Sequence, residues 1–132
     1  MKINRCSYLF FSALIATLIL AIKFASIVSF LSNSSRYSST YLLGASLGLS
    51  LIAPHLSFFT VGVIFNWLGY FKNNKAFTLI SAVAYSVSGV ILFTSALDVV
   101  ISAVLSFIGY VQLDKVIETN NLNQKAIKTT VN

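Results

Sequence analysis

Four polar side chains stand inside or beside long apolar stretches of this chain: Lys23, His55, Asn66 and Asp98. Ionisable groups in such stretches mark functional sites by default, because hydrocarbon cannot hydrate them. His55 is the only histidine and directly follows the only proline, Pro54. Its imidazole can repair the backbone by bonding the carbonyl that proline leaves without a donor, or it can serve as a proton or ligand group.

The other three residues each have a structural explanation beside the functional one. Lys23 lies close enough to the end of its apolar stretch for its ammonium to reach lipid headgroups. Asn66 is expected to bond to a neighbouring helix rather than to a substrate. Asp98, together with Ser95, fits a capping box at the start of a helix.

The residues that catalysis would need are not found at recognisable spacings. The sequence has no H-E-x-x-H motif, no paired carboxylates, no nucleophile with a nearby base and no glycine-rich phosphate loop. A lone histidine cannot hold a metal without partners. Small four-helix drug exporters are similar in size but use a buried acid, whereas the first apolar stretch here carries Lys23. We therefore predict no enzyme activity, no cofactor and no metal.

The composition indicates a membrane protein. Of the 132 residues, 57% are hydrophobic and only 9% are charged, whereas soluble domains have about 25% charged residues. A soluble protein of this length could not bury so much apolar surface. The net charge of +6 would suit nucleic acid, but the basic residues lie at the ends of apolar stretches, so we predict no nucleic-acid partner. The single cysteine, Cys6, excludes an internal disulfide.

Apolar stretches predict four helices, at residues 7–31, 41–71, 76–94 and 96–113. They are followed by a polar cytoplasmic tail, 114–132, that is expected to fray. The fold class is all-α: an integral membrane four-helix bundle with a kinked second helix.

Two boundaries have alternatives. The first stretch resembles a signal peptide, but it has no small-x-small cleavage site at a suitable distance, so we expect an uncleaved helix. The second helix would be about 46 Å long, more than the ~30 Å of bilayer hydrocarbon. Pro54 predicts a kink there, or a separate outer segment at 41–53. We favour one kinked helix.

Small residues at helical spacing predict close helix packing. They are Gly44 and Gly48 on the second helix, Ser81 and Gly89 on the third, and Ser102, Ser106 and Gly109 on the fourth. The ends of the second and fourth helices, residues 68–71 (LGYF) and 108–111 (IGYV), are also similar. This similarity records two related hairpins, or it reflects how often Gly and Tyr occur at membrane interfaces.

Basic residues gather on one side of the membrane when the N-terminus is placed inside. Arg36 alone then falls outside, and the cytoplasmic side holds Lys2, Arg5, Lys72, Lys75, Lys115, Lys125 and Lys128. Positive charge is retained on the cytoplasmic side of membrane proteins. The sequence therefore predicts a multi-pass protein of the cell (inner) membrane with both termini in the cytoplasm.

Residues 53–79 resemble a segment found in small, uncharacterised multi-pass membrane proteins of bacteria. The shared pattern is A-P-H-L, then F-N with a glycine, then a basic turn and A-F-x-L. The resemblance implies a bacterial inner-membrane protein and carries no activity with it.

Two functions fit these features. The first is association through helices in the lipid bilayer, as a subunit, modulator or immunity-type protein that binds a second copy or another membrane protein. The alternative is an oligomeric pore or small transporter, holin-like, built around the kink beside His55. The lack of a polar stripe along a whole helix tells against the alternative.

Overall fold

The chain is all-α in this computed structural model, which describes residues 5–92 and 96–131, without the side chains of 96, 98 and 128–131. The helices are α1 (Ser7–Ser32), α2 (Ser39–Lys72), α3 (Lys75–Ile91) and α4 (Ala96–Val131), with a short 3-10 turn, η1 (Ser34–Arg36), between α1 and α2. No strand occurs in the described ranges. The predicted all-α fold with four helices is confirmed.

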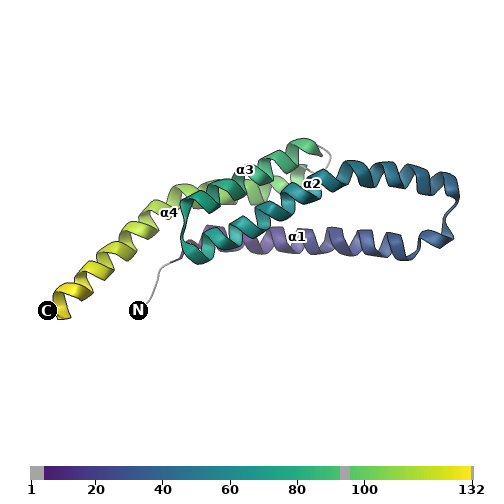
Figure 1. Cartoon of the computed structure of the whole chain (residues 1–132). Coiled ribbons are helices and arrows are strands. Elements are labelled where there is room, and N and C mark those ends of the chain that lie inside the picture. The colour runs from purple at the N-terminus through teal and green to yellow at the C-terminus, as the bar shows by residue number, and fades with distance from the viewer. Residues whose placement is uncertain (1–4, 93–95, 132) are drawn as a thin grey trace.

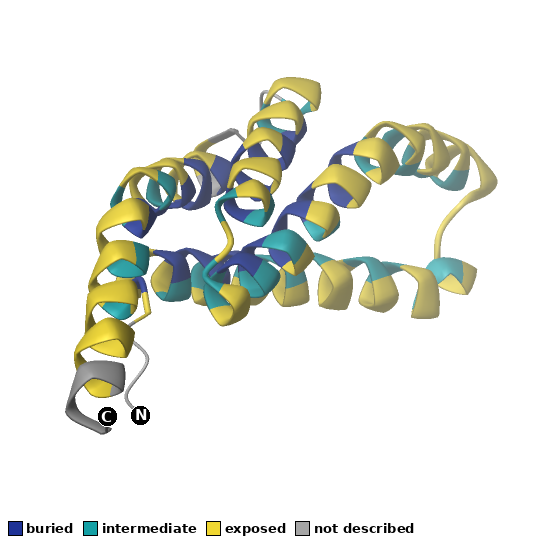
Figure 2. Ribbon diagram, turned by 60° about the vertical axis from the view of Figure 1, so that its left-hand side comes forward, coloured by how far each residue is buried: buried dark blue, intermediate teal, exposed yellow. Residues whose placement is uncertain are grey.

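Each helix packs mainly against two others, in the cyclic order α1–α2–α3–α4 and back to α1. Figure 1 shows α1 and α2 as a long hairpin, with α3 and α4 beside only the half of it where α1 begins and α2 ends. Figure 2 shows that the buried residues are confined to this shared half. The core therefore lies at one end of the hairpin, and the other end projects beyond it.

The second helix is continuous through Pro54. Residues 41–53 therefore continue α2, and the alternative of a separate outer segment is wrong. Ser38 caps the start of α2 by accepting the Tyr41 N–H at 3.4 Å, and Asn73 ends it with a left-handed φ of 48°, a conformation that Asn tolerates well. Figure 1 shows α2 changing direction between its two halves, as expected of a helix that lacks one backbone donor.

The polar end of the chain differs from the prediction. The expected fraying of 114–132 is wrong, because α4 continues as one helix to Val131. Its Leu113, Val116 and Ile117 pack against Cys6 and Leu9 at the start of α1. This packing holds the first turns, and each further residue then adds a backbone hydrogen bond to a helix that is already nucleated.

The third helix ends at Ile91, earlier than the predicted boundary at 94. The predicted end and the capping residue Ser95 lie outside the described residues. Three helices, α1, α2 and α4, are long and apolar enough to cross a membrane, while α3 is a shorter apolar helix of 17 residues.

The two hairpins bury equivalent positions. On α1 the buried residues are Leu9, Ser12, Ala13 and Ala16, and the same spacing recurs on α3 at Thr78, Ser81, Ala82 and Tyr85. On α2 they include Phe59, Gly62, Val63, Asn66 and Gly69, and the same spacing recurs on α4 at Val99, Ser102, Ala103, Ser106 and Gly109. All four helices share the offsets 0, 3, 4 and 7 among these residues, which is the ordinary spacing of a packed helix face. The spacing therefore does not decide whether the similarity of 68–71 to 108–111 records two related hairpins. The first hairpin extends beyond the second where α1 ends and α2 begins (Figure 1).

Candidate functional site

Asn66 lies at the centre of a fully buried polar cluster to which all four helices contribute. Its Nδ2, which has two hydrogens to donate, lies within hydrogen-bond distance of the hydroxyls of Ser12 on α1 at 2.7 Å, Ser106 on α4 at 3.3 Å and Tyr85 on α3 at 3.4 Å. Ser12 in turn donates to the Ser102 carbonyl at 2.9 Å. As expected from the sequence, Asn66 bonds across to neighbouring helices.

The hydroxyls of this cluster also bond to one another. Ser12 and Ser106 lie 2.9 Å apart, and Ser81 lies 3.4 Å from Ser106. Among the described residues, Asn66 Oδ1 and Ser102 Oγ have no partner. Such bonds are typically worth ~0.6 kcal/mol each in a membrane, so the cluster serves to align the helices more than to stabilise them.

Sequence reasoning missed Ser12, which connects α1 to this cluster. Single hydroxyls are common in apolar stretches, and the buried spacing of segment 9–16 recurs on all four helices. The sequence therefore offers no specific signal for Ser12.

Glycines and a cysteine mark close approaches between helices at the end of the bundle where α1 begins. A Cβ on Gly69 would lie 2.6 Å from Thr78 Oγ1, and one on Gly109 would lie 2.7 Å from Leu9 Cδ2. Cys6, which is buried, places its sulfur 3.8 Å from the Gly109 carbonyl. These two glycines allow α2 to approach α3, and α4 to approach α1, in equivalent ways.

The small residues singled out from the sequence fall into two groups. Ser81, Ser102 and Ser106 are fully buried within the bundle, and a Cβ added to Gly89 would lie 3.9 Å from Val99 Cγ1. Gly44 and Gly48 instead have open space, with no atom within 4 Å of an added Cβ. The stripes on α3 and α4 are therefore used within the chain, and the pair on α2 is not.

His55 connects α2 to α3. The ring is fully buried, and its Nδ1 lies 2.9 Å from the Ser88 carbonyl oxygen and 2.9 Å from the Ser88 hydroxyl. That hydroxyl donates to the His55 carbonyl at 3.0 Å. The structural role expected from the sequence, repair of the backbone at Pro54, is corrected: the ring reaches across to the neighbouring helix instead.

Lys23 and His55, which lie on different helices, line the same cavity of about 210 Å³. Asn66 belongs to the separate cluster described above. Asp98 stands in the first turn of α4, but its side chain is not among those that the structure describes. The capping role predicted for Asp98 therefore stays a prediction. Two of the four polar candidates are thus brought together.

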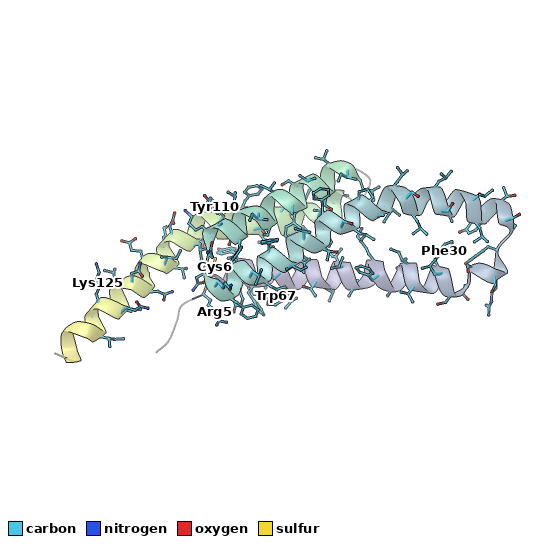
Figure 3. The ribbon with its side chains drawn as sticks, viewed as in Figure 1. Arg5, Cys6, Phe30, Trp67, Tyr110 and Lys125 are labelled. Carbon is cyan, nitrogen blue, oxygen red and sulfur yellow. The ribbon has the colours of Figure 1, made fainter. Side chains whose placement is uncertain are left out.

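Basic and aromatic side chains gather at the end of the bundle where α1 begins. Arg5 lies over the Tyr70 ring at 5.3 Å, and Lys75 lies over the Tyr110 ring at 4.7 Å. Figure 3 shows Arg5, Cys6, Trp67 and Tyr110 at this end, far from Phe30.

Lys75, the first residue of α3, also donates a hydrogen bond to Asp114 Oδ2 at 2.7 Å. This hydrogen bond raises the pKa of Lys75 above its usual value. The lysine is therefore charged at neutral pH.

Among the described residues, no three His, Cys, Asp or Glu side chains come together in the way a metal site requires. Comparison of the chain with protein-family models, curated proteins and solved structures gives no match. The resemblance of residues 53–79 to bacterial membrane proteins stays a prediction.

Proposed function

We propose that this chain is a multi-pass protein of the cell membrane, with four crossings and both termini in the cytoplasm. The start of α1, the α2–α3 turn and the end of α4 lie at one end of the molecule (Figure 1). Arg5, Lys72 and Lys75 all lie at this end, each over an aromatic ring. The positive-inside rule supports a cytoplasmic location for it.

Two aromatic clusters support the placement in the bilayer. At the inner end, Phe10 contacts Trp67 and Tyr70. At the tip of the α1–α2 hairpin, Phe30 stacks on Tyr37 with ring centroids 5.7 Å apart. Along α1, Phe10 and Phe30 are separated by about 30 Å at the usual helical rise, which matches the hydrocarbon thickness of a bilayer. Aromatic residues favour the two interfaces of that layer.

The function best supported is association with another membrane helix. The observation that carries this proposal is an unpacked face on the outer half of α2, the outer hairpin face, formed by Leu43, Gly44, Leu47, Gly48 and Leu51. Its leucines are 68%, 70% and 68% exposed, and a Cβ added to either glycine would meet no atom within 4 Å outside its own turn of helix. No residue from 17 to 54 is buried.

A leucine ridge beside two glycines suits close packing by a second helix in lipid, because the groove lets backbones approach. In a helix each glycine costs up to about 1 kcal/mol relative to alanine, and within this chain Gly44 and Gly48 gain no contact in return. We propose that the protein acts as a subunit, modulator or immunity-type protein, and that this face binds its partner, a second copy or another membrane protein.

The alternative of an oligomeric pore or small transporter has less support. The centre of the bundle is filled by Phe59 and Tyr85, and the buried hydroxyls are bonded to one another rather than arranged along a path. Substrate-dependent flux into proteoliposomes would be the result that favours it.

Cysteine cross-linking in native membranes tests the association. In a Cys6→Ser background, Leu47→Cys is expected to form an intermolecular disulfide on mild oxidation, because that side chain lies on the outer hairpin face. The product would be a dimer of this chain or an adduct with another protein, identified by mass. Adding Gly48→Leu should abolish the product by filling the groove.

The matched control is Val90→Cys in the same background. Val90 is an apolar residue of α3 with 79% exposure. If cross-linking came only from random collision in the membrane, Val90→Cys would give the same yield of disulfide as Leu47→Cys. Equal yields from the two positions, or no product from either, would contradict the proposed face.

A further inference from the structure

An apolar groove runs along α1 beside Trp67 of α2. Leu18 and Ile22 in this groove are each 59% exposed, so the described chain leaves much of the groove open. The groove has a volume of about 650 Å³ and is lined by Phe10, Leu14, Thr17, Leu18, Ala21, Ile22, Ala25 and Trp67. Its occupant therefore has to come from outside the described chain.

The lining of the groove offers no hydrogen bond to a polar ligand. The Thr17 hydroxyl accepts the indole N–H of Trp67 at 3.0 Å and donates to the Ala13 carbonyl at 2.7 Å. These two bonds satisfy the polar side-chain groups of the lining and hold the indole against α1. What remains is aliphatic and aromatic surface, which is suited to an alkyl chain.

The length of the groove matches the depth of a bilayer leaflet. From Phe10 to Ala25 it extends about 22 Å along α1 at the usual helical rise. One leaflet takes half of the ~30 Å of hydrocarbon, roughly 15 Å. With Phe10 at the inner interface, the groove covers the whole depth of the inner leaflet. An acyl chain of a phospholipid in that leaflet can therefore lie along it.

An aromatic cluster connects the inner end of the groove to a cation. Phe10 and Trp67 contact Tyr70, with ring centroids 5.5 and 6.1 Å apart. The Arg5 guanidinium lies over the rings of Tyr70 and Phe71, 5.3 and 5.5 Å from their centroids. Figure 3 shows Arg5 and Trp67 at this same end of the bundle. Because α1 runs outward from its start, Arg5 lies on the headgroup side of Phe10.

The Arg5 guanidinium is available to a phosphate. Arg5 is exposed, and the structure shows no ion pair between it and an acid among the described residues, whereas Asp114 at this end pairs with Lys75. Stacking on aromatic rings orients the plane of a guanidinium and leaves its N–H groups able to bind a phosphate in a bidentate manner.

The charge of Arg5 decides between the possible occupants of the groove. An apolar helix of another protein would fill the groove and leave the guanidinium without an anion. An anionic phospholipid supplies both an alkyl chain and a phosphate with net negative charge. The chain as a whole, with nine Lys and Arg against three acids, also attracts anionic lipids.

We propose that the groove along α1 binds one anionic phospholipid, with an acyl chain in the groove and the phosphate hydrogen-bonded to Arg5. The assignment to the inner leaflet rests on the membrane placement proposed above, whereas lipid binding itself does not. The site lies on α1 and is separate from the outer hairpin face on α2.

The test uses the single tryptophan of the chain, Trp67, which lines the groove and is quenched by bromine atoms placed there. The full-length protein in maltoside micelles is titrated with phosphatidylglycerol or phosphatidylcholine, each brominated in the upper part of one acyl chain. We expect saturable quenching by phosphatidylglycerol at a concentration roughly fivefold or more below the one that phosphatidylcholine needs, the gain typical of one basic residue meeting an anionic lipid.

Two charge variants separate the site from a general effect of positive charge. Arg5→Gln should remove most of the advantage of phosphatidylglycerol. Lys72→Gln removes the same charge from the end of α2, where the ammonium lies over the Phe77 ring of α3, and should keep that advantage. The emission spectrum of Trp67 in lipid-free micelles should be the same in both variants as in the parent, because its bond to Thr17 is intact.

Two further variants test the groove. Ala21→Phe should abolish saturable quenching by either lipid, because its ring fills the groove. Val28→Phe is the matched control at an exposed position of α1 outside the groove and should have no effect. The proposal is overturned if the two lipids quench alike, if the two charge variants behave alike, or if Ala21→Phe changes nothing. Cross-linking through Leu47→Cys is measured independently, so the two proposals can fail separately.

Discussion

Gly62→Ala is expected to lower the free energy of unfolding by about 1–3 kcal/mol, the usual cost of overpacking a core. A Cβ on Gly62 would lie 2.6 Å from both Cδ1 and Cε1 of Tyr85. The Tyr85 ring is fully buried against Phe59, with centroids 5.4 Å apart, so it cannot move aside freely. Titration of the purified protein in mixed micelles with a denaturing detergent measures the change in the free energy of unfolding.

Gly44→Ala is the matched control on the same helix. No atom lies within 4 Å of the added methyl, and alanine is favoured over glycine in a helix by up to about 1 kcal/mol. We expect unchanged or slightly higher stability. An equal loss of stability in the two variants would show that the α2–α3 contact at Gly62 is not as described.

Tyr85→Ala is expected to have the larger effect. Losing the ring leaves a cavity of roughly 100–150 Å³, comparable to one that accepts benzene. At about 24 cal/mol per Å³, this lowers the free energy of unfolding by about 2–4 kcal/mol. Tyr85→Phe keeps the ring and loses only the 3.4 Å bond from Asn66, so it should cost about 0.6 kcal/mol. The same detergent titration measures both variants.

The two positions should also interact energetically. In a Tyr85→Ala background the methyl of Gly62→Ala enters the vacated space, so its cost should disappear, and the double-mutant cycle should show the non-additivity expected of residues in contact. Additive losses, or a Tyr85→Phe variant as unstable as Tyr85→Ala, would contradict the central position of this ring.

The helices could be predicted from the sequence because apolar stretches and their polar ends are local signals. Counting residues against membrane thickness showed that the second helix is too long and left a kink and a break at Pro54 both open. The structure shows that α2 is continuous there. The helical tail was missed for a physical reason. Leu113, Val116 and Ile117 owe their order to contacts with Cys6 and Leu9 at the other end of the chain, and no local pattern contains that information.

The candidate site was only partly predictable. Composition alone pointed to Lys23, His55 and Asn66, since polar groups stand out in apolar stretches. Which of them meet depends on how each helix is rotated and how far it is shifted along its neighbours. The bond from His55 to Ser88 crosses from α2 to α3, so its partner could not be found by considering α2 and Pro54 alone.

Accessibility of single cysteines in intact cells tests the central claim of a four-crossing membrane protein most directly. In a Cys6→Ser background, a membrane-impermeant maleimide should label Ser38→Cys, next to the α1–α2 turn, in intact cells. It should label Asn74→Cys, in the α2–α3 turn, and a cysteine added after Asn132 only once the cells are opened. Labelling of Asn74→Cys in intact cells, or failure to label Ser38→Cys until lysis, would contradict the proposed membrane topology.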